Sequence, residues 1–309
     1  MIVVAGLTPA WQQILRFDSF RLGEVNRAAE AQWCASGKVL NVGIAATLLG
    51  SPCRTICPVG GPARAAFERE CGELNMAVDW IAASEPTRVC TTLLDDATAE
   101  TTELVENARP LNAAELRAYV EAYGRAAAQA DVAVLTGSLP ANVPTDFYRE
   151  LAALTPGRMI VDARGPELLS LLDGARKPTI VKPNREELAK TSGTPLDDDE
   201  SLVAAMRSLN ARGAEWVVVS GGPQAVWATT RDEVRRLTPP RVERVVNPIG
   251  CGDCLAAGIA DALDRGCEVV EALRFGIAAA VDNLTTLVPA RIDRSRAARW
   301  APTIGVERW

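Results

Sequence analysis

Short apolar runs alternate with amphipathic helical patterns along most of this 309-residue chain. The runs are almost continuously hydrophobic, as in strands that are buried on both faces. Such strands, separated by helices, favour a mostly parallel sheet between two helical layers. The predicted strands are Ile2–Ala5, Arg54–Pro58, Val132–Leu135, Met159–Asp162, Thr179–Lys182, Trp216–Ser220 and Ala225–Thr229. The predicted helices are Lys38–Leu49, Ala63–Cys71, Ala113–Gln129, Thr145–Leu154, Pro166–Asp173, Arg185–Lys190, Asp198–Arg212 and Asp253–Arg265.

Two stretches, 10–35 and 87–109, interrupt this alternation with polar and β-forming residues. Within the second, Thr87–Leu94 and Thr101–Val105 flank an acidic turn and predict a hairpin. We expect both stretches to form a small β lid on a single domain spanning residues 1–309. Exposed edge strands pair readily with other chains, so a homodimer through the lid is expected.

The composition excludes several kinds of chemistry. The chain has no histidine, which rules out Ser-His-Asp triads and histidine-bearing zinc sites. A net charge of -6 and a pI near 5.0 argue against a broad nucleic-acid surface. The eight cysteines lack paired zinc-knuckle spacing, so we expect reduced, buried thiols in the cytoplasm, with Cys251 the best candidate for an exception. No signal peptide or apolar run of membrane-spanning length is apparent.

A glycine-rich turn before one helix carries the clearest functional signal. The β-branched pair Val245-Val246 leads into Asn247–Gly258, which holds Gly250, Gly252 and Asp253. Glycines at a helix start leave backbone N–H groups bare, and the helix dipole favours an anion there. Asp253 could take the proton from a hydroxyl that attacks a phosphoryl group held by this turn. The alternative is an ordinary strand, turn and helix with Asp253 as N-cap.

Two further motifs carry charged side chains. Ser36–Gly43 opens a helix with Gly37 and Lys38, and it is not a P-loop; Lys38 could meet a charged group or simply be exposed. In Lys182–Leu188, Asn184 and Glu187 have the spacing of a capping box. The same pair could instead face a magnesium–phosphate cluster through water.

Two turns follow predicted strands. Thr136–Pro140 could hold a phosphate or sugar oxygen, or could be a plain turn. Ser220–Pro223 is a tight turn suited to lie against a nucleotide.

In order and spacing, these motifs resemble the PfkB family of ribokinase-like carbohydrate kinases, from Leu7 to about Leu287. The resemblance is strongest to the branch of tagatose-6-phosphate kinase and 1-phosphofructokinase, and it is carried by Leu7–Ala10, Gly23–Arg27, Thr87-Arg88 and Asn247–Asp253. It implies a three-layer α/β/α fold with a β lid. The implied activity is ATP-dependent phosphorylation of a hexose phosphate of the tagatose 6-phosphate, fructose 1-phosphate or fructose 6-phosphate type.

The resemblance also implies residue roles. Asp253 would be the catalytic base, beside an anion hole of the N–H groups of Gly250, Cys251 and Gly252. Asn184 and Glu187 would organise Mg²⁺ through water. The nucleotide would be bordered by Lys182, Ser220, Gly222, Gly250 and Asn283. The acceptor would be bound by Gln12, Gly37, Lys38, Asn41, Arg88, Ser138 and Arg27, the last from the lid or from a partner subunit.

Two departures from the family pattern fall at the acceptor end. Val39 follows Gly37-Lys38 where the family has glycine, and Gln12 stands where it has an aspartate that grips sugar hydroxyls. Glutamine still forms hydrogen bonds but carries no charge. The alternatives are therefore a kinase of an unphosphorylated sugar or nucleoside, or a non-catalytic sugar-phosphate-binding protein. Lys38 and Arg88 favour a phosphorylated acceptor.

Overall fold

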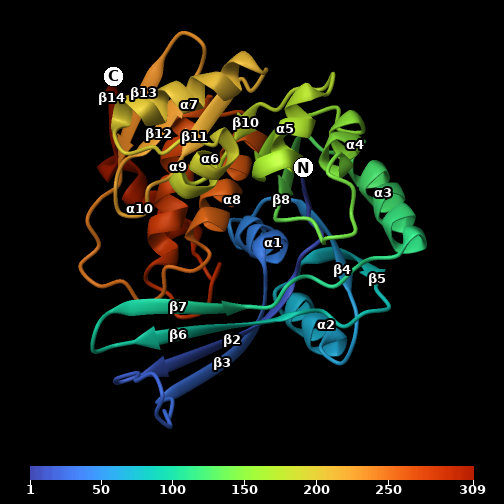
Figure 1. Ribbon diagram of the computed structural model, residues 1–309, viewed down its shortest axis with the longest axis vertical. Helices are drawn as coiled ribbons and strands as arrows, with labels where there is room; N and C mark the ends of the chain where they lie inside the picture. Colours follow the sequence, from blue (N-terminus) through green and yellow to red (C-terminus); the bar gives the residue numbers. More distant parts are fainter.

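The computed structural model describes residues 1–309 as a three-layer α/β/α body with a separate small sheet (Figure 1). The large sheet has ten strands in the order β14-β13-β12-β11-β10-β9-β8-β1-β4-β5. It is parallel from β11 to β5, and β12, β13 and β14 run antiparallel. The strands are β1 (Ile2–Ala5), β4 (Cys53–Val59), β5 (Ala77–Ala82), β8 (Val132–Thr136), β9 (Arg158–Asp162), β10 (Ile180–Val181), β11 (Trp216–Val219), β12 (Val226–Thr229), β13 (Val234–Thr238) and β14 (Gly305–Arg308).

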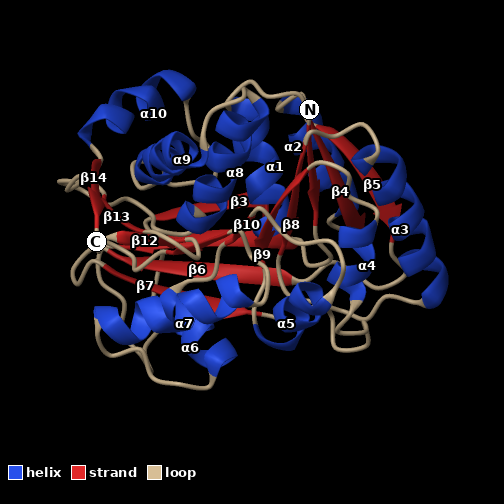
Figure 2. Cartoon of the chain, turned by 90° about the horizontal axis from the view of Figure 1, so that it is seen from above, coloured by secondary structure: helices blue, strands red, loops and turns tan.

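Helices cover both faces of this sheet, as Figure 2 shows. One layer holds α1 (Lys38–Leu48), α2 (Arg64–Glu73), α8 (Cys251–Asp264), α9 (Val269–Asn283) and α10 (Arg294–Trp300). The other holds α3 (Ala113–Ala127), α4 (Phe147–Ala153), α5 (Gly165–Asp173), α6 (Arg185–Ser192) and α7 (Asp199–Ala211). Strand β1 shows why the strand sequences are continuously apolar. Its Ile2 and Val4 belong to one hydrophobic core and its Val3 and Ala5 to the other, so both faces of the strand are buried. The predicted α/β class is confirmed. None of the helices combines the length and apolar character needed to span a bilayer.

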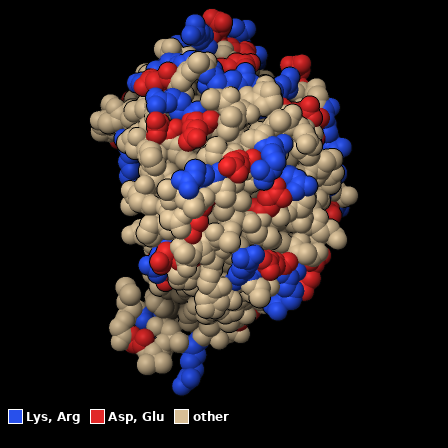
Figure 3. All heavy atoms as spheres, turned by 90° about the vertical axis from the view of Figure 1, so that its right-hand side faces the viewer, with Lys and Arg blue, Asp and Glu red and all other residues tan.

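The predicted lid is present as a four-stranded sheet in the order β3-β2-β6-β7. Its strands are β2 (Ala10–Phe17), β3 (Glu30–Ser36), β6 (Val89–Asp95) and β7 (Glu100–Val105). The sheet lies at the bottom of Figure 1, below the body. The end of the lid that carries its loops projects at the lower left of Figure 3. The same figure shows positive and negative side chains interspersed over the visible face of the body.

The chain leading into the glycine-rich turn is a loop, unlike the strand of the ordinary strand, turn and helix alternative. Val245 and Val246 lie in a loop, not in a strand, because the segment between β13 and α8 contains Pro239, Pro240 and Pro248. Proline lacks the N–H group that a strand ladder needs. Helix α8 begins at Cys251 with Gly250 as N-cap, so the alternative in which Asp253 is the N-cap is wrong.

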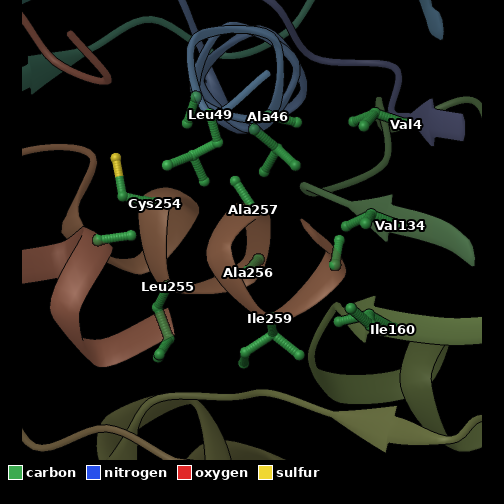
Figure 4. Close-up of a cluster of buried hydrophobic side chains, with 14 of the residues drawn as sticks. Val4, Ala46, Leu49, Val134, Ile160, Cys254, Leu255, Ala256, Ala257 and Ile259 are labelled. Atoms are coloured by element: carbon green, nitrogen blue, oxygen red, sulfur yellow. The ribbon is translucent and has the colours of Figure 1, made fainter. Parts of the chain in front are cut away.

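Helix α8 is buried between α1, α9 and the sheet. Figure 4 shows its apolar side chains facing Leu49 on one side and Val134 and Ile160 on the other. Its contact with α9 depends on two glycines, because a Cβ atom on Gly258 would lie 2.8 Å from the Cα of Gly276. This close helix pair holds the start of α8 in place over the sheet.

We predict that Gly258→Ala destabilises the protein, because a methyl group overpacks the α8–α9 contact at a cost of about 1–3 kcal/mol. Thermal unfolding followed by circular dichroism should show a lower Tm. Gly72→Ala is the matched control: this exposed glycine of α2 has no atom within 4 Å of the added methyl group. There the substitution should leave Tm unchanged or raise it. Equal effects of the two substitutions would contradict the close-packing interpretation.

Candidate active site

A cavity of about 1070 Å³ opens where the C-terminal ends of the parallel strands meet the start of α8 and the lid. This is the edge at which ligands bind in such sheets. Most of the predicted site residues line it: Gln12, Gly37, Lys38, Asn41, Arg88, Lys182, Asn184, Glu187, Ser220, Gly222, Gly250, Cys251, Gly252 and Asp253. Arg27, Ser138 and Asn283 do not line it.

The turn that begins α8 presents backbone N–H groups to the cavity. Gly250 has a φ of 85°, a conformation that glycine adopts without strain, and no side chain caps the helix. No protein group accepts the N–H of Gly250 or of Gly252. The N–H of Cys251 differs from the prediction, because it donates to the carbonyl of Pro248 at 3.3 Å and closes the turn. The free amides and the dipole of the 14-residue helix together make an anion site.

Asp253, in the first turn of α8, is buried with 7 % of its surface exposed. The Nδ2 of Asn41 on α1 donates to its Oδ2 at 2.7 Å, and the hydroxyl of Ser36 donates to the Oδ1 of Asn41 at 3.1 Å. Burial raises the pKa of Asp253 to about 6; the ammonium of Lys38 opposes this shift and the nearby carboxylate of Asp162 adds to it. Asp253 is therefore a fixed carboxylate with a pKa suited to accept a proton near neutral pH.

A buried carboxylate that carried no sequence signal of its own organises the lysines. Asp162 ends β9, and its two oxygens lie 3.0 Å from the Nζ of Lys38 and 3.3 Å from the Nζ of Lys182. Burial would raise the pKa of Asp162, but the two ammonium groups outweigh it and lower that pKa. The Nζ of Lys38 is also 3.4 Å from Glu187. Lys38 therefore points toward Glu187. Only its position at the end of a predicted strand could have drawn attention to Asp162.

Asn184 and Glu187 form the predicted capping box at the start of α6. The N–H of Glu187 donates to the Asn184 Oδ1 at 2.8 Å, and the N–H of Asn184 donates to the Glu187 Oε2 at 3.0 Å. The remaining Glu187 oxygen faces Lys38 in the cavity. Helix capping thus occupies one oxygen of each side chain and leaves one carboxylate oxygen for the site.

The predicted acceptor residues separate into two groups. Gln12 is buried in the lid wall, and the guanidinium of Arg88 donates to the carbonyls of Thr8, Pro9 and Glu106, which leaves two of its five N–H groups. Ser138 is exposed outside the cavity. Arg27 is exposed in the loop between β2 and β3.

Asn283 has a different role from the one predicted. It is fully buried at the end of α9, where its Nδ2 donates to the carbonyl of Ile249 at 2.8 Å and its Oδ1 accepts the N–H of Ala290 at 2.7 Å. Its Nδ2 also lies 3.3 Å from the Sγ of Cys251, and the thiol of Cys254 donates to its Oδ1 at 3.5 Å. The amide is thus used within the protein, where it braces the residue before Gly250, and not toward the nucleotide. Asn283 therefore positions the anion turn.

One part of the cavity wall is apolar, a feature that no single sequence motif signalled. Its walls come from β12, the β13–α8 loop and α9, which are distant in sequence. They are formed by Val226, Pro239, Pro240, Val242, Pro248, Ile277, Val281 and Leu284. An apolar slot beside an anion site suits a planar base attached to phosphates.

Comparison with known proteins identifies the family. Residues 1–286 match the model of the pfkB family carbohydrate kinases, and the chain belongs to this family of phosphotransferases. Its fold is similar to a possible 1-phosphofructokinase of Thermotoga maritima, with a TM-score of 0.91 and 21% identity over 100% of this chain and 99% of that one. It is also similar to phosphofructokinase-2 of Escherichia coli in complex with substrates and products, with a TM-score of 0.87 and 24% identity over 98% of both chains. Ribokinase of Thermotoga maritima gives a TM-score of 0.77 at 21% identity, over 98% and 99% of the two chains. The predicted family and ribokinase-like fold are confirmed.

We predict that kcat/KM falls as the pH drops below about 6, because Asp253 must be ionised to accept a proton and its pKa is raised to about 6. A pH profile of the initial rate measures this. Lys38→Met should move the inflection to higher pH, because the ammonium that lowers the pKa of Asp253 is lost. An inflection near the ordinary carboxyl pKa of about 4 would contradict the role of Asp253 as the proton acceptor.

Proposed function

We propose that this protein transfers the γ-phosphoryl group of ATP to a hydroxyl of a sugar or sugar phosphate, with Asp253 as the general base. The observation that carries the proposal is the buried Asp253 carboxylate beside the free amides of the α8 turn. The hydroxyl proton passes to Asp253, the hydroxyl oxygen bonds to the γ-phosphorus, and the bond to the β-phosphate oxygen breaks to release ADP. The amides of Gly250 and Gly252 stabilise the negative charge of the transferring group.

The nucleotide fits the remainder of the cavity. Its base would occupy the apolar slot, while Lys182, Ser220 and Gly222 border the phosphates. The side chains do not form a cluster of three or more residues that could hold a metal by themselves. The Glu187 Oε1, which takes no part in helix capping and lies 3.4 Å from the Nζ of Lys38, suits a hydrated Mg²⁺ that arrives with the nucleotide and is held through water. Such an ion would neutralise phosphate charge during transfer.

A hexose phosphate is the acceptor that the sequence favours. The two free N–H groups of Arg88 support it, as does the complex of Escherichia coli phosphofructokinase-2 with fructose-6-phosphate. Two ion pairs of Lys38, with Asp162 and Glu187, support the alternative of an unphosphorylated sugar. An ATP-consumption assay with tagatose 6-phosphate, fructose 1-phosphate, fructose 6-phosphate and the free sugars distinguishes them. Tight sugar-phosphate binding without turnover would instead indicate the non-catalytic protein.

We predict that Asp253→Asn lowers kcat by about 10³-fold, the range expected for loss of a general base. Asparagine can still accept the hydrogen bond from Asn41, so the fold should remain. The variant's Tm should not fall, because removal of a buried carboxylate with a raised pKa relieves a desolvation cost. Steady-state kinetics and thermal unfolding measure the two effects. Activity close to that of the wild type would remove Asp253 from its role.

We also infer a cytoplasmic homodimer that forms through the lid. All eight cysteines are free thiols, as a reducing compartment allows. The lid face turned away from the cavity carries the apolar side chains Leu15, Trp33, Leu93 and Leu104, and Trp33 and Leu104 are 46% and 56% exposed. In such a dimer, Arg27 would reach the acceptor site of the second copy, because it does not line the cavity of its own chain.

We predict that the wild-type protein is a dimer in light scattering and that Leu104→Glu makes it a monomer, because a buried charge disfavours an apolar interface. Leu154→Glu is the matched control, since Leu154 is 41% exposed on the body and should not affect assembly. A monomeric wild type, or a dimeric Leu104→Glu protein, would contradict the lid interface.

A further inference from the structure

The wall that the lid contributes to the cavity holds a carboxylate that no sequence motif singled out. Glu103 lies on β7, directly opposite Thr92 of β6, and it lines the same cavity as Asp253 and Asn41. The hydroxyl of Thr92 donates to the Glu103 Oε1 at 3.2 Å. The Nε2 of Gln12 on β2 lies 2.6 Å from the Thr92 Oγ1 and 3.5 Å from the same Glu103 oxygen. Three lid strands therefore hold one carboxylate in a fixed position.

The free atoms of this cluster are hydrogen-bond acceptors. Gln12 uses its amide nitrogen toward Thr92 and Glu103, and no protein group donates to its Oε1, although the side chain is only 3 % exposed. The Oε2 of Glu103 likewise has no donor. Gln12 and Glu103 thus expose two acceptor oxygens to a cavity that the protein itself does not fill. Gln12 is buried, whereas Glu103 is an exposed residue on the outermost strand of the lid. Both free oxygens can accept hydrogen bonds from the donor groups of a ligand in the cavity.

The chemistry of the free oxygens identifies the ligand group. Hydroxyl groups donate hydrogen bonds, and a carboxylate accepts from them more strongly than a neutral oxygen does. A phosphate offers only acceptor oxygens and negative charge, so it would be repelled at Glu103. Burial raises the pKa of Glu103, and the hydrogen bonds from Thr92 and Gln12 and the charge of Arg88 oppose this shift.

We propose that Glu103, oriented by Thr92 and Gln12, binds hydroxyl groups of the acceptor next to the hydroxyl that is phosphorylated, and that it determines which sugar is accepted. This inference rests on the proposed function. It assigns the carboxylate to a lid strand, whereas the sequence resemblance places one at position 12, where this chain has glutamine.

The test compares Glu103→Gln and Glu103→Ala with Glu100→Gln. Glu100 lies on the same strand, is exposed, and alternates to the opposite face of the lid, so its variant controls for the change in net charge. Initial rates are measured with the best acceptor from the sugar and sugar-phosphate screen, together with ATP hydrolysis in the absence of acceptor. Sugar binding by calorimetry, without ATP, is measured on the same proteins.

A lost charge-assisted hydrogen bond of about 1.5–3 kcal/mol corresponds to about 10–150-fold in affinity. We expect kcat/KM for the acceptor to fall about tenfold in Glu103→Gln and about 100-fold in Glu103→Ala, mainly through KM. The kcat/KM of Glu100→Gln for the acceptor should equal that of the wild type. The rate of ATP hydrolysis without acceptor should be the same in all of these proteins. Wild-type protein should discriminate against acceptor analogues that lack a hydroxyl flanking the reacting one, and Glu103→Ala should lose that discrimination.

The outcomes separate the two proposals. If the wild type phosphorylates a sugar and both Glu103 variants keep its KM and its discrimination, the role of Glu103 is overturned and the kinase function stands. If the wild type binds a sugar without turnover and the Glu103 variants bind it less tightly, the acceptor site stands and the kinase function fails. If the wild type neither phosphorylates nor binds any sugar in the screen, both are overturned.

Discussion

The ion pairs of Asp162 with Lys38 and Lys182 are the interaction on which the site depends. Asp162 is almost completely buried, and an unpaired charge there would be strongly disfavoured. Its two oxygens are satisfied by lysines from α1 and from the end of β10, so the carboxylate joins two elements that are distant in sequence. The ammonium of Lys38 also limits the rise in the pKa of Asp253. One buried charge therefore links the sheet, the two lysines and Asp253.

The parallel sheet makes this arrangement possible. The carboxyl ends of β9, β10 and β11 lie at one edge, so Asp162, Lys182 and Ser220 lie near each other without any sequence proximity. Helix α8 then brings its amides to the same edge because Gly258 and Gly276 allow it to pack closely against α9. The lid closes the other side and contributes Gln12 and Glu103. Groups from the sheet edge, from the start of α8 and from the lid thus face one cavity.

Much of the fold could be predicted from the sequence because local patterns determine local structure. Continuous apolar runs predicted β1 and β8, and the spacing of Asn184 and Glu187 predicted a capping box that the structure contains. The sequence did not indicate β5, β13 or β14. Strand β14 is entirely exposed and β5 lacks a fully buried residue, so neither has the apolar run that marks a buried strand.

The candidate site was predicted only in part, because only local patterns can be recognised in a sequence. Glycine turns and charged strand ends are visible in the sequence, and they drew attention to Asp253, Lys38 and Lys182. The hydrogen-bond partner of a side chain is not visible there. Asn283 was therefore expected near adenine, whereas it braces Ile249, and the N–H of Cys251 was counted as free although it closes the turn on Pro248.

By itself, the sequence determined the α/β class and the family, and it singled out Asp253 at the start of α8, because each of these depends on residue type and short spacing. Only the tertiary structure decided which charges are paired and which oxygens remain free. Asp162 and Glu103 have no local signature. The sheet edge places Asp162 beside two lysines, and the lid places Glu103 in the wall of the cavity. Pairing and desolvation are properties of neighbours in space, and the order of residues does not specify those neighbours until the chain has folded.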